Sequence, residues 1–344
     1  MIRTHNEGKS VMTSRFSIPV LLFLAGFCIL PARHAAADDK DEQPRTRPVI
    51  SEEVAPLEAV APVAKDGHKG EAFLRKPPGK GPFPAVVIVH GGSTTFPTAA
   101  LKKFALGTWP SRFLAAGYVV AVPTFRSRDA DPQTRDSLDD VLATIEHVRK
   151  LSYVDAKSIV VNGVSSGGDL ALAVAVETDV AVIVPDEPAS MLFTGMVTKD
   201  APKKGESWTS YFGLDPKRWR LLYTPECQKL TRDKIAKIRC PIILVQGDVF
   251  PVINFNKEIL IPELRDLGKN VVVLTYPGEP HGFAFSESMK GREKFPHPRT
   301  ATRPFPAVAE SAFEDVHALA RRHLPTKPTP IDAKLVKQVP FEEK

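Results

Sequence analysis

Two serines stand inside a short glycine-rich stretch, IVVNGVSSGGDLAL (159–172). Apolar residues precede and follow it, so we expect a buried strand that turns directly into a helix. Gly163, Ser165 and Gly167 fit the pattern G-x-S-x-G, in which a sharp turn exposes a serine hydroxyl above a sheet. Ser166 does not fit as the central serine, because a valine would then take a glycine position. The pattern points to Ser165 as a nucleophile for acyl transfer.

Two further motifs supply partners for such a serine. HGGS (90–93) ends a buried apolar run, and the N–H of Gly91 or Gly92 is expected to form an oxyanion hole with the N–H of Ser166. The stretch YPGEPHGF places His281 on a short loop after the last expected strand, within reach of the serine as a general base. The three motifs therefore predict one site at one edge of a sheet.

Three hypotheses are open for the carboxylate that would orient the histidine. Asp248 lies directly after a strand-ending glycine in QGDVFPV, and a local bulge could carry it to His281. Asp186, in IVPDEPAS, follows the preceding strand. The third reading has no acid, which leaves a Ser–His dyad or an inactive site. We expect Asp248, because the imidazolium formed during attack needs a nearby negative charge and the chain order serine, acid, histidine is kept.

Apolar runs alternate with amphipathic segments between these motifs. Such alternation predicts an α/β fold with a mostly parallel sheet and helices on both faces. A hairpin over 57–77 is expected to turn at Asp66-Gly67, and residues 98–116 are expected to be helical with a break near Trp109-Pro110. The remaining expected strands are 83–90, 118–125, 158–164, 181–185, 241–247 and 271–277, and the remaining expected helices are 136–151, 166–177 and 306–323.

The quoted motifs, with DGHKGEAFLRKPPGKGPFPAVVIVHGG and PIILVQGD, resemble the α/β-hydrolase superfamily over roughly 57–324. The nearest branch resembles dienelactone hydrolases and the catalytic domains of prolyl oligopeptidases (S9 peptidases). The resemblance implies Ser165 as the nucleophile and His281 as the base. It also implies an acid three residues after the strand-ending glycine, where this chain has Phe250.

The N-terminal segment has the three-part pattern of a secretory signal peptide. A basic residue precedes the apolar run FSIPVLLFLAGFCIL, and an A-x-A site predicts cleavage after Ala37. An uncleaved anchor is the other reading, although the run is short for a bilayer span. The expected organisation is a signal peptide (1–37), a flexible leader (38–55), an α/β-hydrolase domain (56–324) with a small insert after the sixth strand (187–240), and a C-terminal tail (325–344).

Charge and motif content narrow the possible partners. Residues 1–37 hold four basic residues and one acidic residue, so the rest of the chain has 42 basic and 39 acidic residues, a net charge of +3. This balance gives no case for nucleic-acid binding. No metal-binding, nucleotide-binding or redox-cofactor motif is present, so we expect no cofactor and no metal. The expected partner is a small-molecule ester or a short peptide, with no membrane span after cleavage.

For three features of the sequence, two interpretations remain open. The aromatics Trp208, Tyr211 and Trp219 either line a substrate pocket under a lid or form the insert's own core. Cys227 and Cys240 either pair, as an exported protein permits, or remain separate thiols. The segment RSRD, which begins at residue 126, either holds an anionic substrate group or is a solvated loop.

Two functions fit these observations. The first is an exported serine hydrolase that cleaves an ester, a peptide or a lactone through an acyl-enzyme on Ser165, with His281 as the general base. The second is a non-catalytic binding protein that keeps the fold but lacks a complete triad, a reading that Phe250 favours. The intact Ser165 and His281 favour the enzyme. The oligomeric state is left open.

Overall fold

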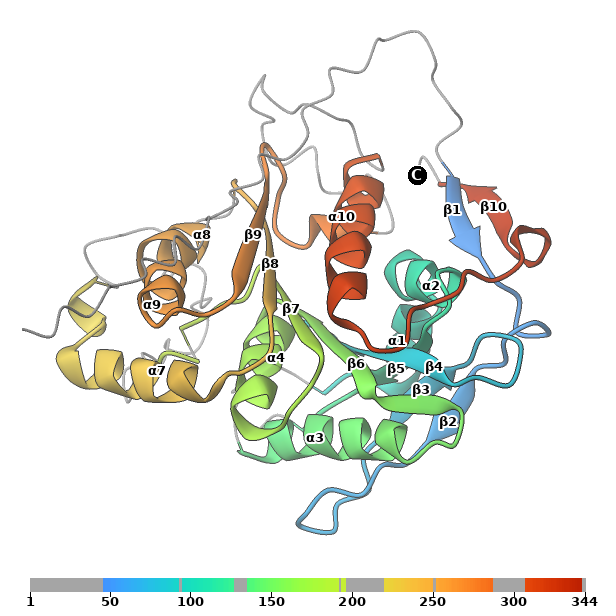
Figure 1. Ribbon diagram of the computed structural model, residues 1–344, viewed down its shortest axis with the longest axis horizontal. Coiled ribbons are helices and arrows are strands. Elements are labelled where there is room, and N and C mark those ends of the chain that lie inside the picture. Colours follow the sequence, from blue (N-terminus) through green and yellow to red (C-terminus); the bar gives the residue numbers. More distant parts are fainter. Residues whose placement is uncertain are drawn as a thin grey trace, which may run out of the picture. The chain divides into compact units, whose positions relative to one another are not determined.

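A central sheet carries the apolar runs of the chain, as expected for strands buried on both faces. The computed structural model (Figure 1) describes residues 46–92, 95–126, 135–191, 193–195, 220–249, 252–286 and 307–341. In these ranges the main sheet has eight strands in the order β2-β3-β5-β4-β6-β7-β8-β9. β3 is antiparallel to both β2 and β5, and all other neighbours are parallel. The prediction of a mostly parallel sheet is confirmed.

The strands lie close to their expected positions. The hairpin is present, with Gly67 at φ +84° in its turn. The main-sheet strands are β2 (Glu58–Val60), β3 (Ala72–Arg75), β4 (Phe83–Val89), β5 (Val119–Pro123), β6 (Val154–Val164), β7 (Val182–Asp186), β8 (Ile242–Gly247) and β9 (Val271–Tyr276). The ends of β4, β6, β7, β8 and β9 therefore meet at one edge, where the predicted site residues lie.

Helices cover both faces of this sheet (Figure 1). The α10 face is covered by α1 (Thr98–Ala105), α2 (Thr108–Ala115) and α10 (Ala307–His323). The α4 face is covered by α3 (Arg135–Arg149), α4 (Ser166–Glu177), α7 (Pro225–Lys237) and α9 (Ile261–Asp266). Short helical segments are α8 (Val252–Phe255), the π-helix η1 (Asn256–Leu260), and the 3₁₀ turns η2 (Phe283–Phe285) and η4 (Ala333–Leu335). Each face of the sheet packs on its own hydrophobic core. Alternate strand residues point to the two cores, with Ile88 on the α10 face and Val87 on the α4 face.

The helix expected over 98–116 is broken at 106–107, close to the expected break near Trp109-Pro110. Pro110 lies in the first turn of α2, where a missing N–H costs no helical bond. Part of the expected flexible leader and part of the tail are ordered. β1 (Thr46–Val49) pairs antiparallel with β10 (Lys337–Pro340).

The chain after β1 is anchored by one buried arginine. The Arg75 guanidinium donates to the carbonyls of Ile50, at 2.6 Å, and Ala55, at 3.1 Å. Ile50 and Ala55 are both buried in the α10-face core. The part of the expected leader over 46–55 therefore pairs with β10 and packs on the domain. Residues 1–37 lie outside the described ranges. Among the described residues, no helix is both long and apolar enough to span a bilayer.

Candidate active site

Ser165 occupies a strained turn between β6 and α4. Its backbone has φ 58° and ψ −119°, a left-handed conformation that is rare for a non-glycine residue. A Cβ on Gly163 would lie 2.0 Å from the carbonyl oxygen of Gly167, and a Cβ on Gly167 would lie 2.4 Å from that of Val89. Both positions therefore require glycine, as the motif predicts. The second glycine makes room for the neighbouring strand β4, which brings the HGGS loop close to the serine.

The predicted oxyanion loop packs directly on this turn. A Cβ on Gly91 would lie 3.2 Å from the Cβ of Ser165, and Gly92 has φ +96°. The Ser166 hydroxyl donates a hydrogen bond to the carbonyl oxygen of Gly92 at 2.5 Å. The Ser166 backbone N–H lies in the first turn of α4, where N–H groups have no partner inside the helix. The structure brings these four residues together, and their oxyanion role stays a prediction.

A buried histidine supports the loop that is predicted to form the oxyanion hole. The ring of His90 stacks between Phe96, at 3.7 Å, and Phe125, at 4.4 Å. Burial lowers the pKa of His90 to about 4, so the ring is neutral at neutral pH. Its Nδ1 lies 2.8 Å from the carbonyl oxygen of Gly91 and must donate there, which leaves Nε2 to accept from the Thr124 hydroxyl at 3.3 Å. Sequence reasoning gave His90 no role of its own.

The carboxylate at His281 belongs to Glu187. Nδ1 of His281 lies 3.0 Å from Oε2 of Glu187. The Glu187 side chain is only 4% exposed. Its Oε1 accepts the N–H of Gly247 at 2.8 Å, and its Oε2 accepts the N–H of Gly282. Two backbone N–H donors therefore fix both oxygens of a buried carboxylate that lies next to the imidazole.

The prediction that Asp248 contacts the histidine is wrong in this structure, and so is the alternative Asp186. Asp248 is exposed, and its Oδ1 accepts the N–H of Gly278 at 2.7 Å. Asp186 is fully buried, and neither of its carboxyl oxygens has a hydrogen-bond partner among the described residues. Burial, and then the negative charge of Glu187, raise the pKa of Asp186 well above its usual range. Asp186 contributes its carbonyl instead, which accepts the N–H of Ser165 at 2.9 Å.

Strand parity separates the two adjacent acids. Val182 and Val184 face the α10-face core, so Asp186, two residues further on, faces the same layer. The register pairs Asp186 with Val164 on one side and Val245 on the other. The first residue past the strand, Glu187, is free of this alternation. Its φ of +42° directs the side chain toward the loops after β8 and β9. The parity of IVPDE is the signal that sequence reasoning missed.

Comparison with solved structures identifies the architecture. Carboxyl esterase 2 from Tuber melanosporum superimposes with a TM-score of 0.54 at 18% identity, over 79% of this chain and 88% of that one. Acylaminoacyl peptidase from Pyrococcus horikoshii has a TM-score of 0.54 at 16% identity, over 82% of this chain and 44% of that one. The chain has the α/β-hydrolase fold. Within this fold, residues 73–195 match the family model described as BD-FAE.

One curated relative shares more sequence over a shorter stretch. The quorum-quenching protein AidA of Acinetobacter baumannii (strain MDR-ZJ06) is 32% identical over 114 residues. The match spans 31% of this chain and 36% of that protein. The chain thus matches about a third of that relative's length.

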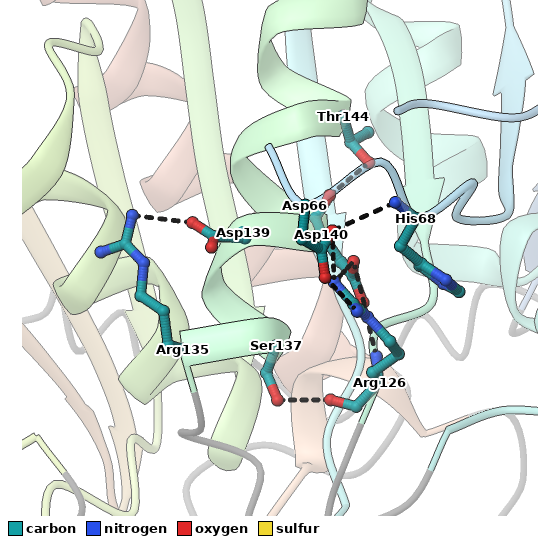
Figure 2. Close-up of polar contacts among 8 residues, drawn as sticks. All are labelled: Asp66, His68, Arg126, Arg135, Ser137, Asp139, Asp140 and Thr144. Atoms are coloured by element: carbon teal, nitrogen blue, oxygen red, sulfur yellow. Dashed lines mark hydrogen bonds and ion pairs between the residues drawn. The ribbon is translucent and has the colours of Figure 1, made fainter. Parts of the chain in front are cut away.

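Arg126 lies at the end of β5, at the same edge of the α/β-hydrolase sheet. Figure 2 shows its guanidinium between Asp66 and Asp140. All three guanidinium nitrogens donate to these two carboxylates, at 2.6 Å to Asp66 and 2.8 Å to Asp140 in the shortest contacts. The Ser137 hydroxyl donates to the carbonyl of Arg126. Arg126 therefore links the hairpin turn to α3, and the structure favours neither reading of the RSRD segment, whose remaining residues lie outside the described ranges.

An apolar cavity of about 210 Å³ opens between α1, α2 and η2. It lies beside both loops of the site, since Phe96 stacks on His90 and Phe285 follows His281 by four residues. Its lining consists of Phe96, Ala100, Lys103, Phe104, Trp109, Pro110 and Phe285. Sequence reasoning missed these residues because they come from two stretches far apart in the chain, 96–110 and the turn that holds Phe285. The aromatics that it proposed, Trp208, Tyr211 and Trp219, lie outside the described ranges.

The two cysteines do not form a disulfide in this structure, which decides the open alternative in favour of separate thiols. Burial raises the pKa of Cys240 to about 12. The Cys227 thiol donates to the carbonyl of Gly195 at 3.6 Å. In the described ranges, no three His, Cys, Asp or Glu side chains gather as a metal site.

Proposed function

We propose that this protein is an exported serine hydrolase that cleaves esters through an acyl-enzyme on Ser165. The observation that carries the proposal is the buried Glu187 carboxylate 3.0 Å from His281 Nδ1, fixed by two backbone donors. The strained turn of Ser165 is joined to the residue before Glu187 by one backbone bond, from the N–H of Ser165 to the carbonyl of Asp186. The non-catalytic alternative depended on a missing acid at Phe250, and Glu187 removes that reason.

Acylation uses all three side chains. The Ser165 hydroxyl oxygen attacks the ester carbonyl carbon while His281 Nε2 accepts the hydroxyl proton. Glu187 Oε2, at Nδ1, stabilises the imidazolium that forms and fixes the ring's tautomer. The N–H of Ser166 and that of Gly91 or Gly92 stabilise the negative oxygen of the tetrahedral intermediate. The intermediate collapses, the imidazolium gives its proton to the leaving alkoxide, and an alcohol departs.

Deacylation repeats these steps with water. His281 takes a proton from a water molecule, whose oxygen attacks the acyl carbon bound to Ser165. The second tetrahedral intermediate expels the serine oxygen, which regains a proton from His281. The products are a carboxylic acid and the free enzyme. The same steps cleave lactones and peptides. The structural neighbours, among them a carboxyl esterase and an acylaminoacyl peptidase, fit this chemistry.

The apolar cavity beside the site supports a small apolar group on one side of the ester. An apolar cavity of about 150 Å³ holds one benzene molecule. The cavity of about 210 Å³ thus suits a group slightly larger than a single ring. Export rests on the signal-peptide pattern of residues 1–37, and the N-terminus of the protein isolated from its host is expected near Asp38.

A fluorophosphonate probe that labels active serines tests the proposed function. We expect the wild type to be labelled at Ser165 and to hydrolyse p-nitrophenyl butyrate. Ser165→Ala should abolish both signals without a change in thermal unfolding. Ser166→Ala is the matched control and should retain substantial labelling, since it loses only the bond to Gly92. Labelling of Ser166 in the wild type, or no labelling at all, would overturn the proposal.

A further inference from the structure

The loop that carries Glu187 has an unusual backbone. Glu187 and Ser190, three residues apart, have φ values of +42° and +60°. Neither is glycine, so the chain does not adopt these conformations without support from neighbouring groups. The loop begins with one backbone bond, from the N–H of Glu187 to the carbonyl of Val245 at 2.7 Å. A second, longer backbone bond runs from the N–H of Ala189 to the carbonyl of Ser165 at 3.4 Å. Side chains add further support to these two bonds.

Two buried polar side chains provide it. Asp169 Oδ1 accepts the N–H of Ser190 at 2.5 Å, and Asn256 Nδ2 donates to the carbonyl of Pro188 at 3.0 Å. The Ser190 hydroxyl donates in turn to Asn256 Oδ1. Asp169 is 0% exposed and Asn256 is 1% exposed, so these bonds form away from water. Both strained ends of the loop are therefore tied to the protein interior.

The two side chains come from elements on either side of the site. Asp169 lies in α4, four residues after Ser165, so one helix carries the nucleophile turn and one half of the support. Asn256 opens the π-helix η1, a helical irregularity that is common at functional sites. A Cβ on Gly168 would lie 3.0 Å from Cα of Pro188, so the loop packs tightly on α4. The loop thus sits in fixed register with Ser165.

We propose that Asn256 and Asp169 are positioning residues that hold the Glu187 carboxylate against His281. The inference rests on the proposed function. Neither side chain touches the reacting atoms; each acts through the loop. When the loop shifts, Glu187 Oε2 leaves its 3.0 Å contact with Nδ1 and the imidazolium loses its nearest negative charge. A displacement of about 1 Å in such a group can lower turnover by about 100-fold.

A double-mutant cycle tests this role. We expect Asn256→Leu to lower kcat on p-nitrophenyl butyrate by about 10- to 100-fold with a KM change below about threefold. In a Glu187→Gln background the same substitution should cost less than about threefold, because residues that act as a unit are not additive. An equal loss in both backgrounds would mean that Asn256 is only structural and would overturn the inference.

Matched variants separate positioning from stability. Asp169→Asn keeps an oxygen that can accept the Ser190 N–H and should retain most activity, whereas Asp169→Leu should resemble Asn256→Leu. Thr144→Val removes a buried hydrogen bond in α3, away from the site, and should leave kcat unchanged. Should Asn256→Leu fail to fold, Asn256→Ser repeats the cycle. Wild-type labelling at Ser165 with an additive cycle defeats this inference alone, while absent labelling defeats the proposed function as well.

Discussion

The loops after β7 and β8 each carry a carboxylate at the same edge of the sheet, and only one meets the histidine. Glu187, after β7, is buried and bonded at both oxygens. Asp248, after β8, is exposed and binds the backbone N–H of Gly278. A Cβ on Gly247 would lie 2.1 Å from the carbonyl of Glu279, so the chain that carries Asp248 passes tightly against the histidine loop. Location at a strand end therefore does not determine which acid contacts the histidine. The backbone direction of each loop determines it.

The largest expected effect comes from exchanging these two carboxylates for amides. Glu187→Gln should lower kcat by about 10⁴-fold, because the amide does not stabilise the imidazolium and can hold the wrong tautomer. Asp248→Asn should change kcat by less than about fivefold, since its amide oxygen can still accept the Gly278 N–H. Both are measured with p-nitrophenyl butyrate and by the rate of fluorophosphonate labelling. A crippled Asp248→Asn beside an active Glu187→Gln would reverse the comparison and return the acid to β8.

The sequence predicted the sheet better than it predicted the acid. The strands were predictable because a strand buried on both faces is continuously apolar, as in FPAVVIV of β4. The serine turn was predictable because Gly163 and Gly167 would clash as any other residue. β1 and β10 were not, because TRPV and KQVP are short and half-exposed and pair across nearly the whole chain. The parity of IVPDE could have turned Asp186 away from the histidine, but the positive φ that directs Glu187 toward it could not be predicted from residue type.

Asp186 and Glu187 are adjacent, but only Glu187 contacts the histidine. A substitution of Asp186 should therefore change stability rather than turnover. Its pKa is raised from an ordinary value of 3.8 by burial, and then by Glu187. The native state therefore keeps a proton that the unfolded state releases above that value, so this group lowers stability as pH rises above about 4. Because asparagine does not titrate, Asp186→Asn removes this pH dependence of stability. We expect its thermal midpoint, relative to wild type, to rise as pH increases above about 4.

Activity provides the second readout for Asp186. Because its side chain faces the α10-face core and not His281, kcat of Asp186→Asn should stay within about threefold of wild type if the fold is retained. The buried amide adds a penalty that does not depend on pH, and Asp186→Leu measures the same pH slope without that amide. A midpoint difference that is flat across pH would show that the carboxyl does not hold a proton in the native state.

The smallest expected effect concerns the opposite case, an exposed carboxylate at the far side of the same edge. Hydrogen bonds from Arg126, the largest cause, lower the pKa of Asp66 to about 2. A lowered pKa stabilises the native state fully above the ordinary value of 3.8, and this stabilisation is lost as pH falls toward 2. Asp66→Asn should therefore be slightly less stable than wild type at pH 6, and the difference in the free energy of unfolding should shrink between pH 5 and pH 3.

KM for a neutral ester and for a succinyl ester should not change in Asp66→Asn, because Asp140 still holds the Arg126 guanidinium. A selective rise in KM for the succinyl ester would instead make Arg126 part of substrate binding.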